Sequence, residues 1–489
     1  MKRMFDWVKK NKFLLTLFSI VLLGAILRFY NYPLRYGFDI DATRDAILTQ
    51  YFASSHIFPL VGPISALGSF NFGPWYYYQL ILFNFFVPLS YAPWIYVSLT
   101  SLLMVVVMYK IGEELLGKEF GLVLALLSAV APGEIISGTG LSNPDLVSLF
   151  ASLSLLIFIL LIKNEKRVWL SLFLGIAIGI GINCHYQMIY FLFLPLLLLF
   201  RKTGKIKVIL LAYLGVFLTF IPLIYFNITH DWKTLTGLLD YYIFGKNKVY
   251  VPNRWLSYLG DFWPTFWGYM LGFNRLVGGL LMVLSLLVSL FVIIKKKISL
   301  SYSLLFILLL FSFVLLRYFS GERVYYYLIF FHPFLILMTG LLLWQLTRIK
   351  ILFDKFGTIF LALILAIIIF FGINVDIVHT HSVDSHLDFV SKANYLSEEY
   401  SGSKFSFYAC DGQYRNVVQG MVFLMVQKNK LGDGVKIGFE DKNCKYPTGK
   451  ENKDAIGAIN FSSFSDKELN SLGWKKISPS YIYSSLTNY

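Results

Sequence analysis

"LVSLFASLSLLIFILLI" (146–162) carries no charged side chain and almost reaches the length needed to cross a membrane. Similar apolar runs occupy residues 13–27, 208–226, 278–294 and 358–373. An α-helix rises about 1.5 Å per residue, so about 20 apolar residues cross the roughly 30 Å of hydrocarbon in a bilayer. These runs predict an all-α polytopic membrane protein.

The composition excludes a soluble protein. Of the 489 residues, 57% are hydrophobic and only 15% are charged, whereas about 25% of the residues in soluble domains are charged. We do not expect the first run to be a cleaved signal peptide, because no small-residue cleavage site follows it and many more apolar runs come later.

The formal net charge of +15 is concentrated in short loops between the apolar runs. The bases cluster in "MKRMFDWVKKNK" (1–12), "KNEKR" (163–167), "RKTGKIK" (201–207), "KKK" (295–297) and "RIKILFDK" (348–355). Short basic loops stay in the cytoplasm under the positive-inside rule. We therefore interpret the charge as a topology signal, and we expect no nucleic-acid partner.

We expect about eleven membrane spans, near residues 13–31, 93–110, 119–136, 145–162, 168–184, 187–200, 207–226, 272–294, 299–317, 325–346 and 356–374. If the N-terminus is cytoplasmic, every basic loop then lies in the cytoplasm and the C-terminus lies outside, as in a multi-pass protein of the cell (plasma) membrane. The segment 73–89 would break this parity. It is short, bounded by prolines and aromatic at its start, so we expect an interfacial helix, with a twelfth span as the alternative.

The sequence changes character near residue 375, where the long apolar blocks stop. Beyond that point, helix-like stretches such as 384–400 alternate with strand-like ones such as "KFSFYA" (404–409). This pattern is typical of a small α/β domain. We therefore expect a transmembrane domain over 1–375 and an extracytoplasmic α/β domain over 376–489.

The chain has three cysteines. Cys184 lies in a predicted span and is expected to be inert packing. Cys410 and Cys444 both lie in the tail, where an extracytoplasmic location would allow a disulfide between them.

The first outer loop, 32–92, contains the dense charged segment "GFDIDATRDAI" (37–47). If a helix runs on from Asp41, then Asp41 and Asp45 share one face, with Arg44 beside Asp45. Asp39 or Asp41 can cap the N-terminus of this helix. One interpretation is a capped amphipathic helix lying on the membrane. The other is a general base held by a nearby arginine at the outer surface.

The second outer loop ends in "LSNPDLVSLF" (141–150), which places Asp145 at the mouth of the fourth span. Asn143 or Asp145 could serve only as a helix N-cap, with Pro144 in the first turn. A second aspartate at the membrane mouth nevertheless favours a catalytic interpretation of both loops. His332 lies inside a predicted span, where ionisable groups are often functional; the alternative, which we favour, is a neutral histidine bonded to a backbone carbonyl.

In order and spacing, these segments resemble the motifs of the C-type, polyprenyl-phosphate-sugar-dependent glycosyltransferases, which are related to protein O-mannosyltransferases and the lipid A aminoarabinose transferase. "DATRDA" (41–46) is similar to the Asp-Glu-Ala-Arg-Tyr-Ala motif of their first outer loop, and "FGPWYYYQLI" (72–81), which contains Tyr76, is similar to a Pro-Pro-Leu-Tyr-Tyr-Trp segment. Further similar segments are "LSNPDLVSLF" (141–150), "INCHYQMIYFLFLP" (182–195), "YFNITHDW" (225–232) and "YYYLIFFHPFLILMTG" (325–340). The resemblance covers roughly residues 1–375.

The resemblance implies an inverting transfer of a sugar from a polyprenyl phosphate to an acceptor on a protein, lipid or glycan at the outer membrane face. Asp41 matches the catalytic aspartate, which takes the acceptor proton. Asp145 matches a second-loop carboxylate that positions the acceptor or helps to hold a metal. The implied substrate-binding residues are Arg44, Asp45, Asp39, Tyr76, His185, His230 and Arg323. Of these, Arg44, His185 and Arg323 are candidates for the lipid phosphate.

Two departures from the family pattern matter. Ala42 stands where the motif has glutamate, so any role of that second acid is lost or moved to Asp45 or Asp39. Asn71 and Phe72 stand where the family often has a charged or histidine residue. We therefore assign no cofactor and leave a divalent metal open.

A multi-span transporter of a lipid-linked or small polar substrate is the alternative function. Transporters usually show internal repeats with helices broken in mid-membrane. The sequence shows no twofold repeat, and its acids lie in outer loops. A scaffold protein that used the tail for partners would not need carboxylates at the membrane mouth.

Overall fold

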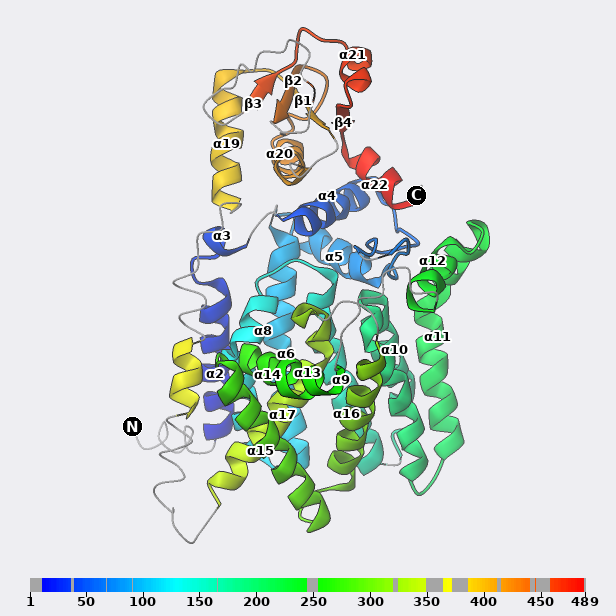
Figure 1. Ribbon diagram of the computed structural model, residues 1–489, viewed down its shortest axis with the longest axis vertical. Coiled ribbons are helices and arrows are strands. Elements are labelled where there is room, and N and C mark those ends of the chain that lie inside the picture. Colours follow the sequence, from blue (N-terminus) through cyan, green and yellow to red (C-terminus); the bar gives the residue numbers. More distant parts are fainter. Residues whose placement is uncertain are drawn as a thin grey trace.

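The computed structural model describes residues 11–36, 39–66, 68–89, 91–164, 166–243, 254–319, 324–348, 364–371, 386–410, 415–439, 445 and 458–487. Figure 1 shows a bundle of long helices, with a small sheet and its helices at one end. The expected fold class, an all-α membrane protein with a small C-terminal α/β region, is confirmed.

Seven helices in the described part of the chain are long and apolar enough to span a membrane. They are α2 (Lys12–Phe29), α6 (Ala92–Leu116), η1 with α9 (Asn143–Lys163), α11 (Lys205–Thr229), α15 (Arg275–Ile294), α16 (Leu300–Tyr318) and η4 with α17 (Tyr325–Leu346). Shorter apolar helices, α7 (Lys118–Val130), α10 (Leu170–Cys184) and η2 (Tyr186–Phe200), cover the remaining predicted spans up to residue 346. The eleventh predicted span, 356–374, lies mostly outside the described residues.

Burial separates the central helices from the peripheral ones. The span Tyr325–Leu346 is 89% buried, whereas α2 is 22% buried and exposes a row of large apolar side chains. Such a row faces lipid when the helix lies at the edge of a membrane bundle. The apolar surface of α2 is therefore a lipid contact.

Two helices of the first outer loop lie at the end of the bundle that carries the sheet. They are α4 (Ile40–Ser55) and α5 (Trp75–Phe86), and they pack against each other (Figure 1). At about 1.5 Å per residue, α5 extends about 18 Å, and α7, which covers a predicted span, is only one residue longer. The interfacial helix at 73–89, with a twelfth span as the alternative, stays a prediction.

Short helices connect the spans. They are α3 (Tyr32–Arg35), α8 (Pro132–Ser137), α12 (Lys233–Tyr242), α13 (Arg254–Ser257), the π-helical turn η3 (Tyr258–Phe262) and α14 (Trp263–Leu271). Proline stands in the first turn of α3, α8 and α14, where its missing N–H costs no helical hydrogen bond.

The C-terminal region contains a four-stranded sheet in the order β3-β2-β1-β4. Its strands are β1 (Phe405–Ala409), β2 (Val435–Phe439), β3 (Ala458–Asn460) and β4 (Lys475–Ile477), and its helices are α19 (His386–Glu399), α20 (Arg415–Gln427), α21 (Asp466–Ser471) and α22 (Pro479–Thr487). The central strands β1 and β2 are parallel, and α20 is the crossover between them, as a parallel pair requires. The edge pairs are antiparallel. The proposed domain boundary near residue 376 remains a prediction.

Cysteine chemistry differs between the two regions. Cys184 is buried and free, as expected. Cys410 is disulfide-bonded, which suits an extracytoplasmic location. The predicted partner, Cys444, lies outside the described residues.

A buried acid–base pair lies within the helical bundle. His332 begins α17 and directs Nδ1 to Oε1 of Glu134 in α8, at 2.6 Å, and both side chains are almost completely buried. The prediction of a backbone carbonyl partner for His332 is therefore wrong. The residues are 198 positions apart, so local sequence patterns gave no sign of the pair.

Candidate active site

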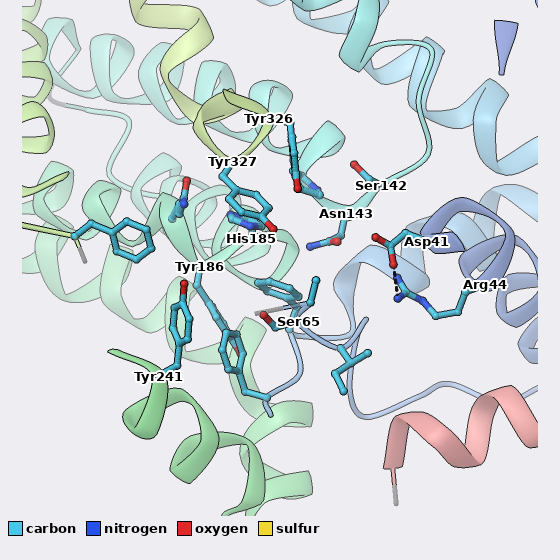
Figure 2. A pocket seen from close by; sticks show the side chains of 17 residues that line it. Asp41, Arg44, Ser65, Ser142, Asn143, His185, Tyr186, Tyr241, Tyr326 and Tyr327 are labelled. Carbon is cyan, nitrogen blue, oxygen red and sulfur yellow. Dashed lines mark hydrogen bonds and ion pairs between the residues drawn. The ribbon is translucent and has the colours of Figure 1, made fainter. Parts of the chain in front are cut away.

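A cleft opens between the end of the helical bundle and α4, and it encloses about 680 Å³ of empty space including its mouth (Figure 2). Its lining residues are Asp41, Arg44, Ile64, Ser65, Ala66, Phe70, Phe72, Ser142, Asn143, Pro144, His185, Tyr186, Gln187, Tyr241, Phe319, Tyr326 and Tyr327. They come from five segments far apart in sequence, so the cleft depends on the whole fold.

Asp41 and Arg44 face the cleft from α4. Arg44 donates from Nη1 to Asp41 Oδ1 at 2.6 Å, and the Asp41 side chain is 49% exposed. Figure 2 shows the Asp41 carboxylate turned toward the cleft, with Arg44 behind it. Asp41 is thus an accessible carboxylate held in place by one guanidinium.

Asp45 lies behind this pair and does not line the cleft. It is fully buried, and its Oδ1 accepts from Arg44 Nε at 2.8 Å and from the Tyr77 hydroxyl at 2.7 Å. Burial raises the pKa of Asp45, while the charge of Arg44 opposes that rise. One arginine therefore bridges an exposed carboxylate and a buried one.

Asp39 is the N-cap of α4. Its side chain accepts hydrogen bonds from the backbone N–H groups of Asp41 at 3.0 Å and Ala42 at 2.8 Å. This satisfies donors that the first helical turn leaves free. Asp39 is outside the cleft lining, so the structure places it in a capping position.

Asp145 is buried directly behind the cleft wall. Its Oδ2 accepts from the backbone N–H of Ser142 at 2.9 Å and from the Ser142 hydroxyl at 2.8 Å, in a capping box at the start of η1. Ser142 and Asn143 themselves line the cleft. The structure thus places Asp145 where it shapes the wall rather than where it touches a ligand.

His185 forms the floor of the cleft between two aromatic rings. Its imidazole stacks on Phe72 at 5.1 Å and on Tyr327 at 4.9 Å between ring centroids. Burial lowers the pKa of His185 to about 3. The ring is therefore neutral at pH 7 and can take part in hydrogen bonds, but it brings no positive charge.

The loop that carries Phe72 fits closely against the end of α10. Gly73 donates its N–H to the carbonyl of Asn183 at 3.0 Å. A Cβ atom at position 73 would lie 1.6 Å from the Asn183 side-chain oxygen, so only glycine permits this approach. Tyr186 donates its hydroxyl to the Asn71 carbonyl at 2.7 Å and fixes the same loop.

Two other predicted site residues do not line the cleft, and a third cannot be placed. Tyr76 is fully buried beneath it, and its hydroxyl has no partner among the described residues. His230 stacks on Phe226 at 4.0 Å at the end of α11, away from the cleft lining. Arg323 lies outside the described residues.

The cleft also contains aromatic side chains that sequence reasoning did not single out. Tyr326 and Tyr327 project from η4, Tyr241 comes from α12, and Phe70 comes from the loop after α4 (Figure 2). The signal was present for two of them, since "YYYLIFFHPF" was recognised as a motif segment. Nothing in the local sequence marked Tyr241 or Phe70.

The acids of the site already have partners within the protein. Within the described ranges, no group of three or more His, Cys, Asp or Glu side chains could hold a metal ion. Asp41 is paired with a cation, and Asp145 is occupied by a capping box. We therefore derive no step through a metal.

Two sequence comparisons bear on the identity of the chain. Residues 77–226 match the family model described as dolichyl-phosphate-mannose-protein mannosyltransferase. This segment begins in α5 and ends in α11, so it covers η1 and the His185 loop. No curated protein matches the chain.

Solved structures share the fold at low sequence identity. ArnT from Cupriavidus metallidurans in the apo state aligns with a TM-score of 0.60 at 10% identity, over 89% of this chain and 94% of ArnT. ArnT bound to undecaprenyl phosphate gives a TM-score of 0.56 at 11% identity, over 88% and 94% of the two chains. The Archaeoglobus fulgidus oligosaccharyltransferase AglB, in complex with an inhibitory peptide and a dolichol-phosphate, gives 0.54 at 11% identity, over 88% of this chain and 70% of AglB.

The matches differ in how much of the neighbour they cover. This chain spans 59% of the apo Archaeoglobus fulgidus oligosaccharyltransferase that it also matches, but almost all of ArnT. The resemblance drawn from the sequence motifs is confirmed: the fold is shared with these C-type glycosyltransferases.

Proposed function

We propose that this chain, which has the C-type glycosyltransferase fold, transfers a sugar from a polyprenyl phosphate to an acceptor at the outer membrane face, with inversion. The observation that carries the proposal is the accessible carboxylate of Asp41, held by Arg44 at the mouth of an aromatic cleft. The solved neighbours that bind undecaprenyl phosphate or dolichol-phosphate support this donor class.

Asp41 is the general base in this proposal. The acceptor hydroxyl or amine attacks the anomeric carbon, the bond from that carbon to the phosphate oxygen breaks, and the acceptor proton passes to Asp41. The polyprenyl phosphate leaves with the bonding electron pair. Because phosphate is a good leaving group, a base without a partner acid is sufficient.

Arg44 orients the Asp41 carboxylate through the ion pair from Nη1 to Oδ1. The third guanidinium nitrogen of Arg44, Nη2, has no hydrogen-bond partner in the described parts of the chain. We assign this nitrogen as the hydrogen-bond donor that contacts the phosphate of the lipid-linked sugar. A charge-assisted bond there would stabilise the charge that grows on the leaving oxygens.

The aromatic wall suits a sugar ring. Tyr241, Tyr326 and Tyr327 combine flat apolar faces with hydroxyl groups, and neutral His185 adds a ring nitrogen. Aromatic faces pack well against the C–H groups of a pyranose, while hydroxyl groups satisfy its polar edge. Asp145 then acts as a positioning residue, because its capping box fixes the loop of Ser142 and Asn143.

A largely apolar hollow adjoins the cleft and suits the polyprenyl chain. It lies between α11 and α12, has about 520 Å³ of empty space including its mouth, and shares Tyr186 with the cleft. Leu223, Leu235 and Leu238 are among its lining residues. A lipid in this hollow would place its phosphate at the cleft mouth.

The basic loops support an orientation with the N-terminus in the cytoplasm and the cleft and tail outside, in the cell membrane. The acceptor would therefore be a protein, lipid or glycan at the outer face. The proposal is tested by incubating the purified protein with a panel of radiolabelled polyprenyl-phosphate sugars and a membrane extract as the acceptor source. Transfer by the wild type that is lost in Asp41→Asn would support it.

Movement of donor across a sealed proteoliposome without any transfer would instead support a transporter. Equal transfer by the wild type and Asp41→Asn would show that the base is misassigned.

A further inference from the structure

The helix that carries Asp41 is buried on nearly all sides. Nine of the residues in α4 are buried, and they are Ala42, Thr43, Asp45, Ala46, Ile47, Leu48, Thr49, Phe52 and Ala53. A helix lying on a membrane surface would bury one face only. Part of this burial comes from the C-terminal region, because α20 and α22 both pack on α4 (Figure 1).

The contact with α22 is aromatic. Tyr483 stacks edge-on against Phe52 at 5.3 Å and lies 6.0 Å from the ring of Tyr51. Phe52 in turn stacks edge-on against Tyr77 of α5 at 5.4 Å. Such ring pairs prefer particular angles, so movement of one ring disturbs the next.

Tyr77 connects this aromatic row to the base. Its hydroxyl donates to Asp45, Asp45 accepts from Arg44 Nε, and Arg44 Nη1 holds Asp41. Each contact from Tyr483 to Asp41 is a packed ring pair or a hydrogen bond. The last hydrogen-bond acceptor is the accessible carboxylate of Asp41. The row therefore joins the C-terminal helix to the residue that we assign as the base.

Two contacts of α20 reinforce the same arrangement. The Thr43 hydroxyl lies 3.5 Å from Gln419 Oε1, one residue from Arg44. Phe423 packs edge-on against Trp94 of α6 at 5.9 Å. The C-terminal region is thus attached both to α4 and to a membrane-spanning helix.

We propose that the C-terminal region is a positioning element of the active site, and that Tyr483 acts through Phe52, Tyr77, Asp45 and Arg44 to hold Asp41 in its catalytic orientation. The role of Asp41 in this statement rests on the proposed function. A general base must lie within hydrogen-bond reach of its proton, and a misplacement of about 1 Å can cost about 10²-fold in rate.

The test compares four variants of the full-length protein in detergent with the wild type. Tyr483→Ala removes the ring, Tyr483→Leu keeps bulk without the ring, and Tyr483→Phe keeps the ring. Tyr481→Ala is the matched control, because Tyr481 is on the same helix but exposed. The measurements are kcat and KM for the polyprenyl-phosphate sugar, and the hydrogen exchange of the amides in α4 and, as an internal control, in α9.

We expect Tyr483→Ala to lower kcat by about 10- to 100-fold while KM for the donor changes less than about twofold. Its α4 amides should exchange faster, and its α9 amides should not. Tyr483→Leu should show the same effects to a smaller degree. Tyr483→Phe and Tyr481→Ala should match the wild type in every measurement.

The proposal is overturned if α4 exchange in Tyr483→Ala and Tyr483→Leu equals that of the wild type, whatever the activity. It is also overturned if KM rises while kcat is unchanged, because the tail would then bind substrate rather than position the base. Faster α4 exchange in Tyr483→Ala, combined with a wild type that transfers no sugar, would support the coupling and refute the proposed function.

Discussion

Nδ1 of His332 lies 2.6 Å from Oε1 of Glu134, and both side chains are buried inside the helical bundle. The other polar atom of each, His332 Nε2 and Glu134 Oε2, has no hydrogen-bond partner in the described residues. Each side chain therefore provides the main hydrogen bond that replaces the other's contacts with water. The pair joins α8 to the start of α17.

Removal of one partner should destabilise the protein more than removal of both. His332→Ala leaves a buried glutamate without a partner, which typically costs about 3–5 kcal/mol. Thermal unfolding in detergent should show a lower Tm for His332→Ala than for the double variant Glu134→Met with His332→Leu, which removes both polar groups and keeps the volume. If the loss of Tm in the double variant equals the sum of the losses from replacing each side chain alone, the two side chains are not coupled.

The three aspartates of the first outer loop should differ sharply in their effect on transfer. Asp41→Asn removes the base but keeps the size of the side chain, and loss of a general base costs about 10²–10⁴ in rate. Asp45→Asn should cost less, since its amide oxygen still accepts from Tyr77 and Arg44. Asp39→Asn should be almost neutral, because asparagine is also a good N-cap.

Transfer rate per correctly inserted protein measures this order. If Asp39→Asn were inactive while Asp41→Asn kept normal turnover, the assignment of the base would be wrong.

Neutral His185 should make stability depend on pH in a predictable direction. Its folded-state pKa of about 3 lies below the usual value of 6.5, so below pH 6.5 the unfolded chain takes up a proton that the folded chain does not. The contribution of neutral His185 to the free energy of unfolding is thus lost as the pH falls from 6.5 toward 3.

The Tm of the wild type should therefore fall more steeply than that of His185→Gln between pH 7 and pH 4. Parallel curves for the two proteins would mean that the imidazole is already charged in the folded state or accessible to water.

The proposed topology can be tested with single cysteines in exposed loops. Gly204, Lys296 and Gly402 lie in three such loops, but each has a positive φ, which a cysteine adopts only with strain. Residues next to them are therefore substituted instead. Thr203→Cys and Lys295→Cys should be shielded from an impermeant thiol reagent in intact cells, and Ser401→Cys should react. A shielded Ser401→Cys would place the tail in the cytoplasm.

The membrane helices could be predicted from the sequence because their signal is local. The apolar run 146–162 corresponds closely to α9. The basic segment 201–207 begins just after η2 and runs into the first turn of α11, and 295–297 lies between α15 and α16. The motif at 41–46 was also found, and its arginine does hold two aspartates. The spacing of three residues on one helix accounts for the contact of Arg44 with Asp41, and Asp45 directly follows Arg44 in the sequence.

The environment of these residues could not be predicted, because it depends on contacts between distant segments. Asp45 and Asp41 looked equivalent on one helix face, but α5 and the C-terminal helices bury the first and leave the second accessible. The partnership of His332 with Glu134 joins helices far apart in sequence. Periodicity describes one element at a time and cannot identify such neighbours.

The stacking of Phe72, His185 and Tyr327 has a consequence for biosynthesis. The three rings come from segments that the ribosome makes at widely separated times, and the last of them leads directly into α17. Until that helix has entered the bilayer, the floor of the cleft lacks one side, and water can reach the imidazole. A partly inserted chain therefore cannot form the complete cleft, and the site is assembled only after α17 has taken its place in the bundle.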